Sequence, residues 1–152
     1  MSNDYLVGID EEIETKEEVE NESIAPEATE YKPRPYLEWT VNDQAFKLKL
    51  TSNIITKLEK RFGDSLLNAV LEKGIPPVSV VITILQAAMQ KYHHGMKIQT
   101  VEDLYDRYIE SGKTQIDLLK EVIYPIMGDA GFFTRGQITE MQKEMETIDT
   151  DL

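Results

Sequence analysis

The residues in this chain that could perform chemistry are two adjacent histidines and a dispersed set of carboxylates. The sequence contains no cysteine, which excludes thiol nucleophiles, disulfides and thiolate metal sites. His93 and His94 are consecutive, and adjacent side chains on a helix point about 100° apart, a poor geometry for binding one metal ion. No second cluster of ligands accompanies them. The pair instead predicts a helix end, where partly cationic side chains are favourable.

The carboxylates of the central part of the chain give no catalytic pattern. Asp103 and Asp106 share one face of a predicted helix, but no further ligands accompany them, so a solvated surface explains them. The sequence has no glycine-rich phosphate loop and no serine elbow. We therefore expect a non-enzymatic binding protein without a cofactor, and an enzyme is the least favoured alternative.

The net charge of −12 is unevenly distributed. Residues 1–33 contain eleven acids and two bases, residues 134–152 contain five and two, and residues 34–133 contain twelve of each. Nucleic-acid binding requires a basic face, and no basic stripe continues the local cluster of Lys57, Lys60 and Arg61. We expect no nucleic-acid partner. No segment resembles a signal peptide or provides the roughly 20 apolar residues of a membrane span, so a soluble protein is expected.

The composition divides the chain into three parts. Residues 1–35 are rich in glutamate and poor in aromatic residues, which predicts an acidic disordered arm. This arm either keeps the protein soluble, or it meets a basic partner or occupies the domain's own groove until it is displaced. Residues 36–133 are predicted to form a helical domain. Residues 134–152 are predicted to be an acidic C-terminal tail that is compatible with a helix.

The element that organises the domain is a predicted buried helix at Val78–Tyr92. Its polar residues recur every three or four positions and leave a broad apolar face, and the run is too long for a strand. Before it, Tyr36–Val41 and Ala45–Leu50 alternate between apolar and polar residues around turn-forming residues 42–44, which predicts a β-hairpin. Trp39 is interpreted as an anchor of the core, with ligand stacking as the less favoured alternative.

Further helices are indicated after this element. Thr100–Asp103 and Thr114–Asp117 each resemble a capping box, so a helix is predicted to begin at both positions. Pro125 is expected to kink or end the second helix near its last turn, and Gly128–Gly131 is expected to break it completely. The overall prediction is a mainly α fold of about five helices with one N-terminal β-hairpin, flanked by acidic flexible tails.

Apolar residues near the C-terminal end are the candidates for contacting a partner. They are the adjacent pair Phe132 and Phe133 and a helically spaced stripe formed by Ile138, Met141, Met145 and Ile148. The stripe is too narrow to fold alone, so it docks on the parent domain, pairs with another copy of the chain, or lies free. Methionine suits a surface that adapts to different partners. The alternative is that these residues merely cover the domain's own core.

The order of these elements resembles the tail assembly chaperones of long-tailed, siphovirus-type bacteriophages and prophages of Gram-positive bacteria. The segments that carry the resemblance are FKLKLTSNIITKLEKRFGDSLLNAVLEKG and PPVSVVITILQAAMQKYHHG, at residues 46–74 and 76–95. Within them, Leu58-Glu59 leads into Phe62-Gly63. The later segments VEDLYDRYIESG and GDAGFF are similar to the C-terminal helices of that family. The resemblance covers residues 36–133 and does not extend to the acidic arm.

This resemblance implies a non-enzymatic chaperone in the cytoplasm of the bacterial host. Such a protein binds the tape-measure protein, keeps it soluble and helps to recruit tail-tube protein. It leaves before the tail is complete, so it is not expected in the mature virion. The family also implies that a longer, frameshifted form can exist. Two alternatives stay open, namely a structural head–tail or capsid-associated component and an acidic inhibitor or DNA mimic.

Overall fold

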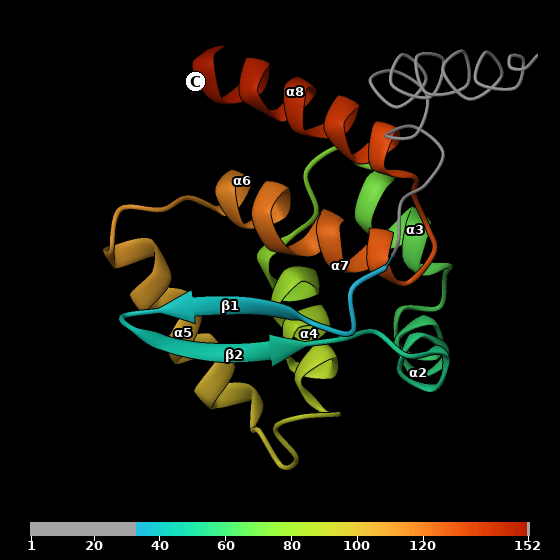
Figure 1. The fold of residues 1–152 in the computed structure, drawn as a ribbon, viewed down its shortest axis with the longest axis vertical. Coiled ribbons are helices and arrows are strands. Elements are labelled where there is room, and N and C mark those ends of the chain that lie inside the picture. Colours follow the sequence, from blue (N-terminus) through green and yellow to red (C-terminus); the bar gives the residue numbers. More distant parts are fainter. Residues whose placement is uncertain (1–32, 152) are drawn as a thin grey trace, which may run out of the picture.

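The computed structural model describes residues 33–151, apart from the side chains of Arg135 and residues 148–151. In chain order the elements are β1 (Leu37–Val41), β2 (Gln44–Leu48), α2 (Ser52–Phe62), α3 (Leu66–Leu71), α4 (Val78–Met89), α5 (Ile98–Glu110), α6 (Gln115–Leu118), η1 (Leu119–Ile123), α7 (Tyr124–Asp129) and α8 (Arg135–Asp151). The predicted mainly helical fold with one N-terminal hairpin is confirmed (Figure 1). Residues 1–32, most of the predicted arm, lie outside the described residues.

The hairpin closes through a two-residue turn. Its strands are antiparallel, and Trp39 lies opposite Phe46, with both side chains buried on the face toward the helices. Asn42 and Asp43 have φ values of 50° and 71°. Asn and Asp tolerate this left-handed conformation, and two such residues match the twist of the flanking strands. Gln44, predicted as part of the turn, is therefore the first residue of β2.

The outer edge of β2 is held by the end of α4. The amide of Lys49 donates to the carbonyl of Ala88 at 2.8 Å, and the amide of Lys47 donates to Nε2 of His93 at 2.9 Å. The imidazole of His93 also packs edge-on against Phe46, with ring centroids 5.5 Å apart. The histidine that the sequence assigns to a helix end is thus a hydrogen-bond acceptor for a strand.

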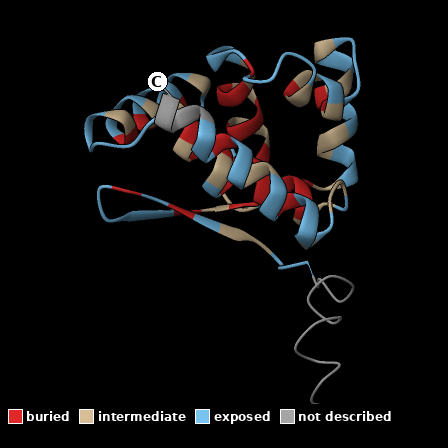
Figure 2. Ribbon diagram, turned by 90° about the horizontal axis from the view of Figure 1, so that it is seen from above, coloured by how far each residue is buried: buried red, intermediate tan, exposed pale blue. Residues whose placement is uncertain are grey.

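The central helix is confirmed as a buried element. α4 contacts β2, α2, α5 and η1, and Figure 2 shows the buried residues gathered where the helices face one another. The buried residues of α4 are Val81, Ile82, Ile84, Leu85, Ala88 and Met89. The helix ends at Met89, three residues before the predicted end at Tyr92. The amide of Gln90 bonds to the carbonyl of Ala87 at 3.2 Å, a tightening that is common in a last helical turn.

One of the two predicted capping boxes is confirmed. Oγ1 of Thr114 accepts from the amide of Asp117 at 3.0 Å, and Oδ2 of Asp117 accepts from the amide of Thr114 at 2.9 Å. The other prediction is wrong, because Thr100 lies inside α5 and Lys97 is the N-cap residue. The earlier start brings Ile98 into the helix, where its side chain packs against the core.

The helical segment after Thr114 contains a widened turn. Residues Leu119–Ile123 form a π-helix, in which the amide of Tyr124 donates to the carbonyl of Leu119. Pro125 follows in the first turn of α7 and has no amide hydrogen to donate. The proline therefore coincides with a distortion of the helix, as predicted, but it does not end the helix, since α7 continues to Asp129.

The break after α7 comes later than the sequence predicts. Gly128 and Asp129 are still helical, and Gly128 is buried. The left-handed residue is Gly131, with a φ of 97°, a conformation that glycine adopts without steric cost. The predicted acidic tail at residues 134–152 contains α8, which contacts α7 and η1 (Figure 1).

Candidate functional site

A capping box starts α8, and it is absent from the sequence prediction. Oγ1 of Thr134 accepts from the amide of Gln137 at 3.1 Å, while Oε1 of Gln137 accepts from the amide of Thr134 at 3.0 Å. The signal is present in the sequence as Thr-x-x-Gln, the standard pattern of this cap. It fixes where α8 begins and therefore which of its residues face the domain.

The predicted partner-binding stripe faces the domain. Ile138 and Met145 are 8% and 7% exposed. Met141 is partly buried and packs against the core cluster that contains Met145. The side chain of Ile148 lies outside the described residues. Of the arrangements that the sequence left open, docking on the parent domain is the one seen here.

Phe132 and Phe133 lie in the loop between α7 and α8. Their ring centroids are 6.4 Å apart, and both side chains are partly buried against the core. The amide of Phe132 donates to the carbonyl of Met127 at 3.0 Å, which holds the loop against the end of α7. The phenylalanine pair and the α8 methionines thus approach one core from two adjacent segments.

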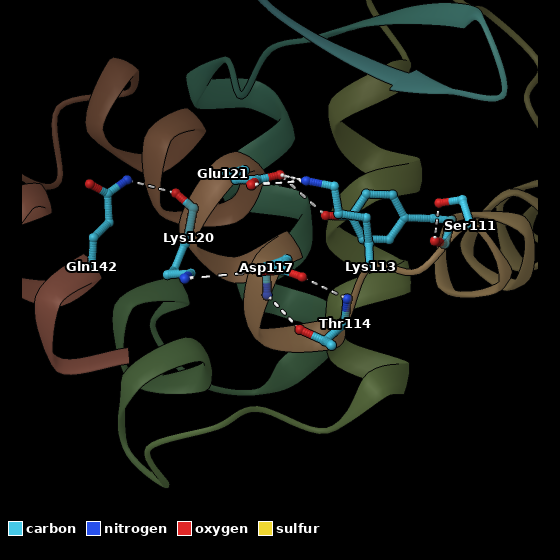
Figure 3. Close-up of polar contacts among 8 residues, drawn as sticks. Ser111, Lys113, Thr114, Asp117, Lys120, Glu121 and Gln142 are labelled. Atoms are coloured by element: carbon cyan, nitrogen blue, oxygen red, sulfur yellow. Dashed lines mark hydrogen bonds and ion pairs between the residues drawn. The ribbon is translucent and has the colours of Figure 1, made fainter. Parts of the chain in front are cut away.

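A polar contact joins α8 to the π-helical turn. Nε2 of Gln142 donates to the carbonyl oxygen of Lys120 at 2.8 Å (Figure 3). In the π-helical pattern the donor for this carbonyl would be the amide of Pro125, five residues later, and proline has none. This contact is partly buried, and α8 supplies a donor that the helix itself does not provide in the π-helical pattern. The sequence gives no signal for this long-range contact.

Two tyrosines connect this region to its neighbours. The hydroxyl of Tyr108 on α5 lies 3.4 Å from a carboxylate oxygen of Glu121, which also pairs with the ammonium of Lys113 at 3.2 Å (Figure 3). Burial, and then the charge of Glu121, raises the pKa of Tyr108 well above its ordinary value. Burial also raises the pKa of Tyr124, with a further contribution from Glu144 of α8. Both hydroxyls stay protonated at neutral pH, as suits structural contacts between helices.

We expect the protein to lose stability at alkaline pH because of these two tyrosines. In the unfolded chain Tyr108 and Tyr124 ionise near the ordinary pKa of 10.0, whereas in the folded protein their pKa values are higher. Below pH 10 both states keep the proton, so this contribution to stability is fully present. As the pH rises above 10, the unfolded state releases its protons first, and the free energy of unfolding falls.

The alkaline loss can be measured by urea unfolding from about pH 8 to about pH 11, with a slope of up to about 1.4 kcal/mol per pH unit for each tyrosine. Emission from Trp39, the single tryptophan, reports unfolding. Tyr108→Phe should reduce the slope above pH 10 and change the stability at pH 8 little, since its hydrogen bond to Glu121 is long. An unchanged slope in this variant would contradict the assignment.

A groove of about 350 Å³ lies between α2 and α4. It is lined by Ile54, Lys57, Leu58, Arg61, Thr83, Gln86, Ala87 and Gln90. The polar stripe of the central helix thus forms one wall, and two cationic residues of α2 lie on the other. The amides of the two glutamines are held in place, since Gln90 donates to the carbonyl of Gln86, and Gln86 donates to the carbonyl of Met96.

The remaining polar residues form no recognisable metal centre in the described part of the chain. No group of three or more histidine, aspartate or glutamate side chains within it could hold a metal ion. The two adjacent histidines lie in different environments. His93 accepts a hydrogen bond from the Lys47 amide, whereas His94 is exposed. Among the helices of residues 33–151, none has the length and apolar character needed to cross a bilayer.

The sequence also matches a protein family. The profile of a family of unknown function, DUF6096, matches residues 38–152. No curated protein and no solved structure matches the chain. The matched segment begins in β1 and includes every later element through α8, while the acidic arm lies outside it. Because the match covers well over half of the sequence, the chain belongs to the family DUF6096.

Proposed function

We propose that this protein is a tail assembly chaperone of a long-tailed bacteriophage or prophage, which binds the tape-measure protein and assists tail-tube assembly without catalysing a reaction. The resemblance of residues 36–133 to such chaperones supports the assignment, and so does the small helical fold. The observation that carries the binding role is α8, a 17-residue helix that covers the core with one narrow apolar stripe. The protein then acts in the cytoplasm of the bacterial host.

α8 has the properties of a helix that a client can replace. Of its described side chains, Ile138 and Met145 are the buried ones, and each contributes roughly 1.5–3 kcal/mol by leaving water. Most helical stability in proteins comes from the packing of an amphipathic face, so the docked state of α8 depends on these few contacts and on the Gln142 hydrogen bond. Segments with so few buried contacts open more readily than the core.

The client implied by the resemblance has the same kind of apolar helical surface as α8. A tape-measure protein is a long helical and partly apolar chain, and an amphipathic helix binds a groove through side chains spaced three and four residues apart. We infer that a client helix replaces α8 on η1 and α7. Phe132 and Phe133 then border the vacated surface. The displaced stripe of Ile138, Met141, Met145 and Ile148 becomes free to contact the client or the tail-tube protein.

Co-expression with the tape-measure protein, followed by affinity purification, tests this function. We expect the two proteins to co-purify and the tape-measure protein to stay soluble only when both are present. If the protein neither binds nor solubilises it, the chaperone assignment is wrong. Mass spectrometry of purified virions separates the alternatives, since a chaperone is absent from the particle and a structural component is present.

We expect Gln142→Ala to increase client binding. The substitution leaves the carbonyl of Lys120 without its donor in the docked state, which weakens docking of α8 by roughly 1 kcal/mol and raises the displaced population about fivefold. Lys143→Ala changes the next residue, which is exposed, and serves as the matched control. Equal complex yields for the two variants would place the client elsewhere on the domain.

A further inference from the structure

The cationic residues of α2 have no acidic partner in the described part of the chain. They are Lys57, Lys60 and Arg61. The ion pairs found among the described residues are Arg34–Asp129, Arg107–Asp103, Lys113–Glu121 and Lys120–Asp117. Eight of the twelve bases in residues 34–133 take part in none of these pairs, and three of the eight are grouped on α2. Their grouping on one helix, rather than the absence of a partner, makes their position informative.

Two of these cations lie along the α2–α4 groove. Lys57 and Arg61 are four residues apart, so they occupy one face of the helix, and both line the groove together with the apolar side chains of Leu58 and Ala87. Lys60 belongs to the same helix but does not line the groove. The groove thus combines an apolar surface with positive charge, which suits an acidic segment that carries occasional aliphatic side chains.

The chain contains such a segment in its N-terminal arm. Residues 10–22, DEEIETKEEVENE, contain eight acidic residues and one lysine. Glu12-Ile13-Glu14 and Glu18-Val19-Glu20 each place an aliphatic side chain between two carboxylates. The charge and the apolar character of this segment therefore complement those of the groove.

The attachment of the arm permits this contact. The guanidinium of Arg34 pairs with the carboxylate of Asp129 at 3.0 Å, which fixes the C-terminal end of the arm. Figure 1 shows that β1 begins at the same end of the hairpin from which β2 leads into α2. The 11 residues that follow Glu22, up to and including Pro33, can span up to roughly 36 Å, about twice the roughly 18 Å length of α4.

We propose that residues 10–22 dock in the α2–α4 groove of the same molecule. Glutamates of the segment pair with Lys57 and Arg61, while Ile13 or Val19 covers the apolar part of the groove. This inference does not rest on the proposed chaperone function, because the surface lies on α2 and α4 rather than beneath α8.

Hydrogen–deuterium exchange of the full-length protein at low salt tests the docking. Two exposed ion pairs together should slow amide exchange in residues 10–22 roughly fivefold relative to the free-chain rate, and salt near 1 M should remove most of this protection. Protection should not change with protein concentration. Protection that grows with concentration would assign the groove to the arm of a second copy and overturn the intramolecular proposal.

Charge-reversal variants test whether the α2–α4 groove is the place where residues 10–22 dock. Lys57→Glu with Arg61→Glu should return residues 10–22 to the free-chain exchange rate. Lys60→Glu with Lys73→Glu is the matched control, because it changes the net charge equally at two exposed positions outside the groove. Glu12→Lys with Glu14→Lys should restore protection in the groove variant. Free-chain exchange in the wild type, or equal loss of protection in both charge-reversed variants, would overturn the proposal.

Discussion

Leu85→Asp is expected to leave the protein unfolded at neutral pH. Leu85 is 0% exposed at the middle of α4, and the buried residues of the described chain include no polar or charged side chain that could pair with a carboxylate. An unpaired buried charge costs several kcal/mol, against a total stability of about 5–15 kcal/mol for a typical domain. Far-UV circular dichroism should show loss of helix, and the emission of Trp39 should shift to the red.

Thr83→Asp is the matched control for this prediction. Thr83 lies on the same helix, two residues earlier, and lines the groove that contains Lys57 and Arg61. A carboxylate there is partly solvated and close to positive charge, so we expect a melting temperature near that of the wild type. Similar effects of both substitutions would contradict the burial of one α4 face. Ile82→Asp should also be destabilising, although Ile82 lies nearer the surface, at 8% exposed.

Trp39→Ala is expected to lower the free energy of unfolding by about 3–5 kcal/mol. Trp39 is 2% exposed and packs against Phe46 of β2 and Tyr108 of α5, so it joins the hairpin to the helices. Its indole N–H has no hydrogen-bond acceptor among the described residues. The loss of stability therefore comes from packing, and urea unfolding followed by circular dichroism measures it.

Trp39→Phe separates the packing contribution from the polar one. Phenylalanine keeps an aromatic ring and removes an N–H that has no acceptor in the described structure, so we expect less than half the loss seen with alanine. Thr40→Ala, on the exposed face of the same strand, should change stability by less than about 0.5 kcal/mol. A loss below about 1 kcal/mol for Trp39→Ala would contradict its role as the anchor of the hairpin.

The hairpin and the central helix could be predicted because their patterns are local. Alternation around Asn42-Asp43 and the spacing of polar residues in α4 depend on residues a few positions apart. The end of α4 could not be predicted, because Gln90–Tyr92 is compatible with a longer helix. A tertiary contact accompanies the end instead, since His93 lies where it accepts from the Lys47 amide.

The two predicted capping boxes show that the same local signal can be right at one position and wrong at another. The box at Thr114 forms as its sequence indicates. The signal at Thr100 is similar, but the helix starts at Ile98, where burial of an apolar side chain outweighs the cap. The Thr134–Gln137 box was equally visible in the sequence. A cap motif therefore does not by itself fix the residue at which a helix begins.

The residues of the candidate site could be predicted from the sequence, but the residues that they contact in the folded domain could not. Spacing alone placed Ile138, Met141 and Met145 on one face of a helix, and that face is the docked one. The contact between Gln142 and Lys120 joins residues 22 positions apart and depends on how α8 crosses η1. The groove between α2 and α4 likewise requires two elements whose relative placement no local pattern contains.

The π-helical turn at Leu119–Ile123 also affects how the length of this segment can change in evolution. Its hydrogen bond joins residues five positions apart, so the turn contains one residue more than an α-helical turn. Deleting one residue from it would favour a regular α-helix and leave the following side chains on nearly the same face, so that Ile126 and Met127, now 1% and 0% exposed, would still face the core. In a regular α-helical turn, by contrast, a one-residue deletion rotates all following side chains by about 100°. The π-helical turn is therefore the place in this segment where a single deletion disturbs the core least.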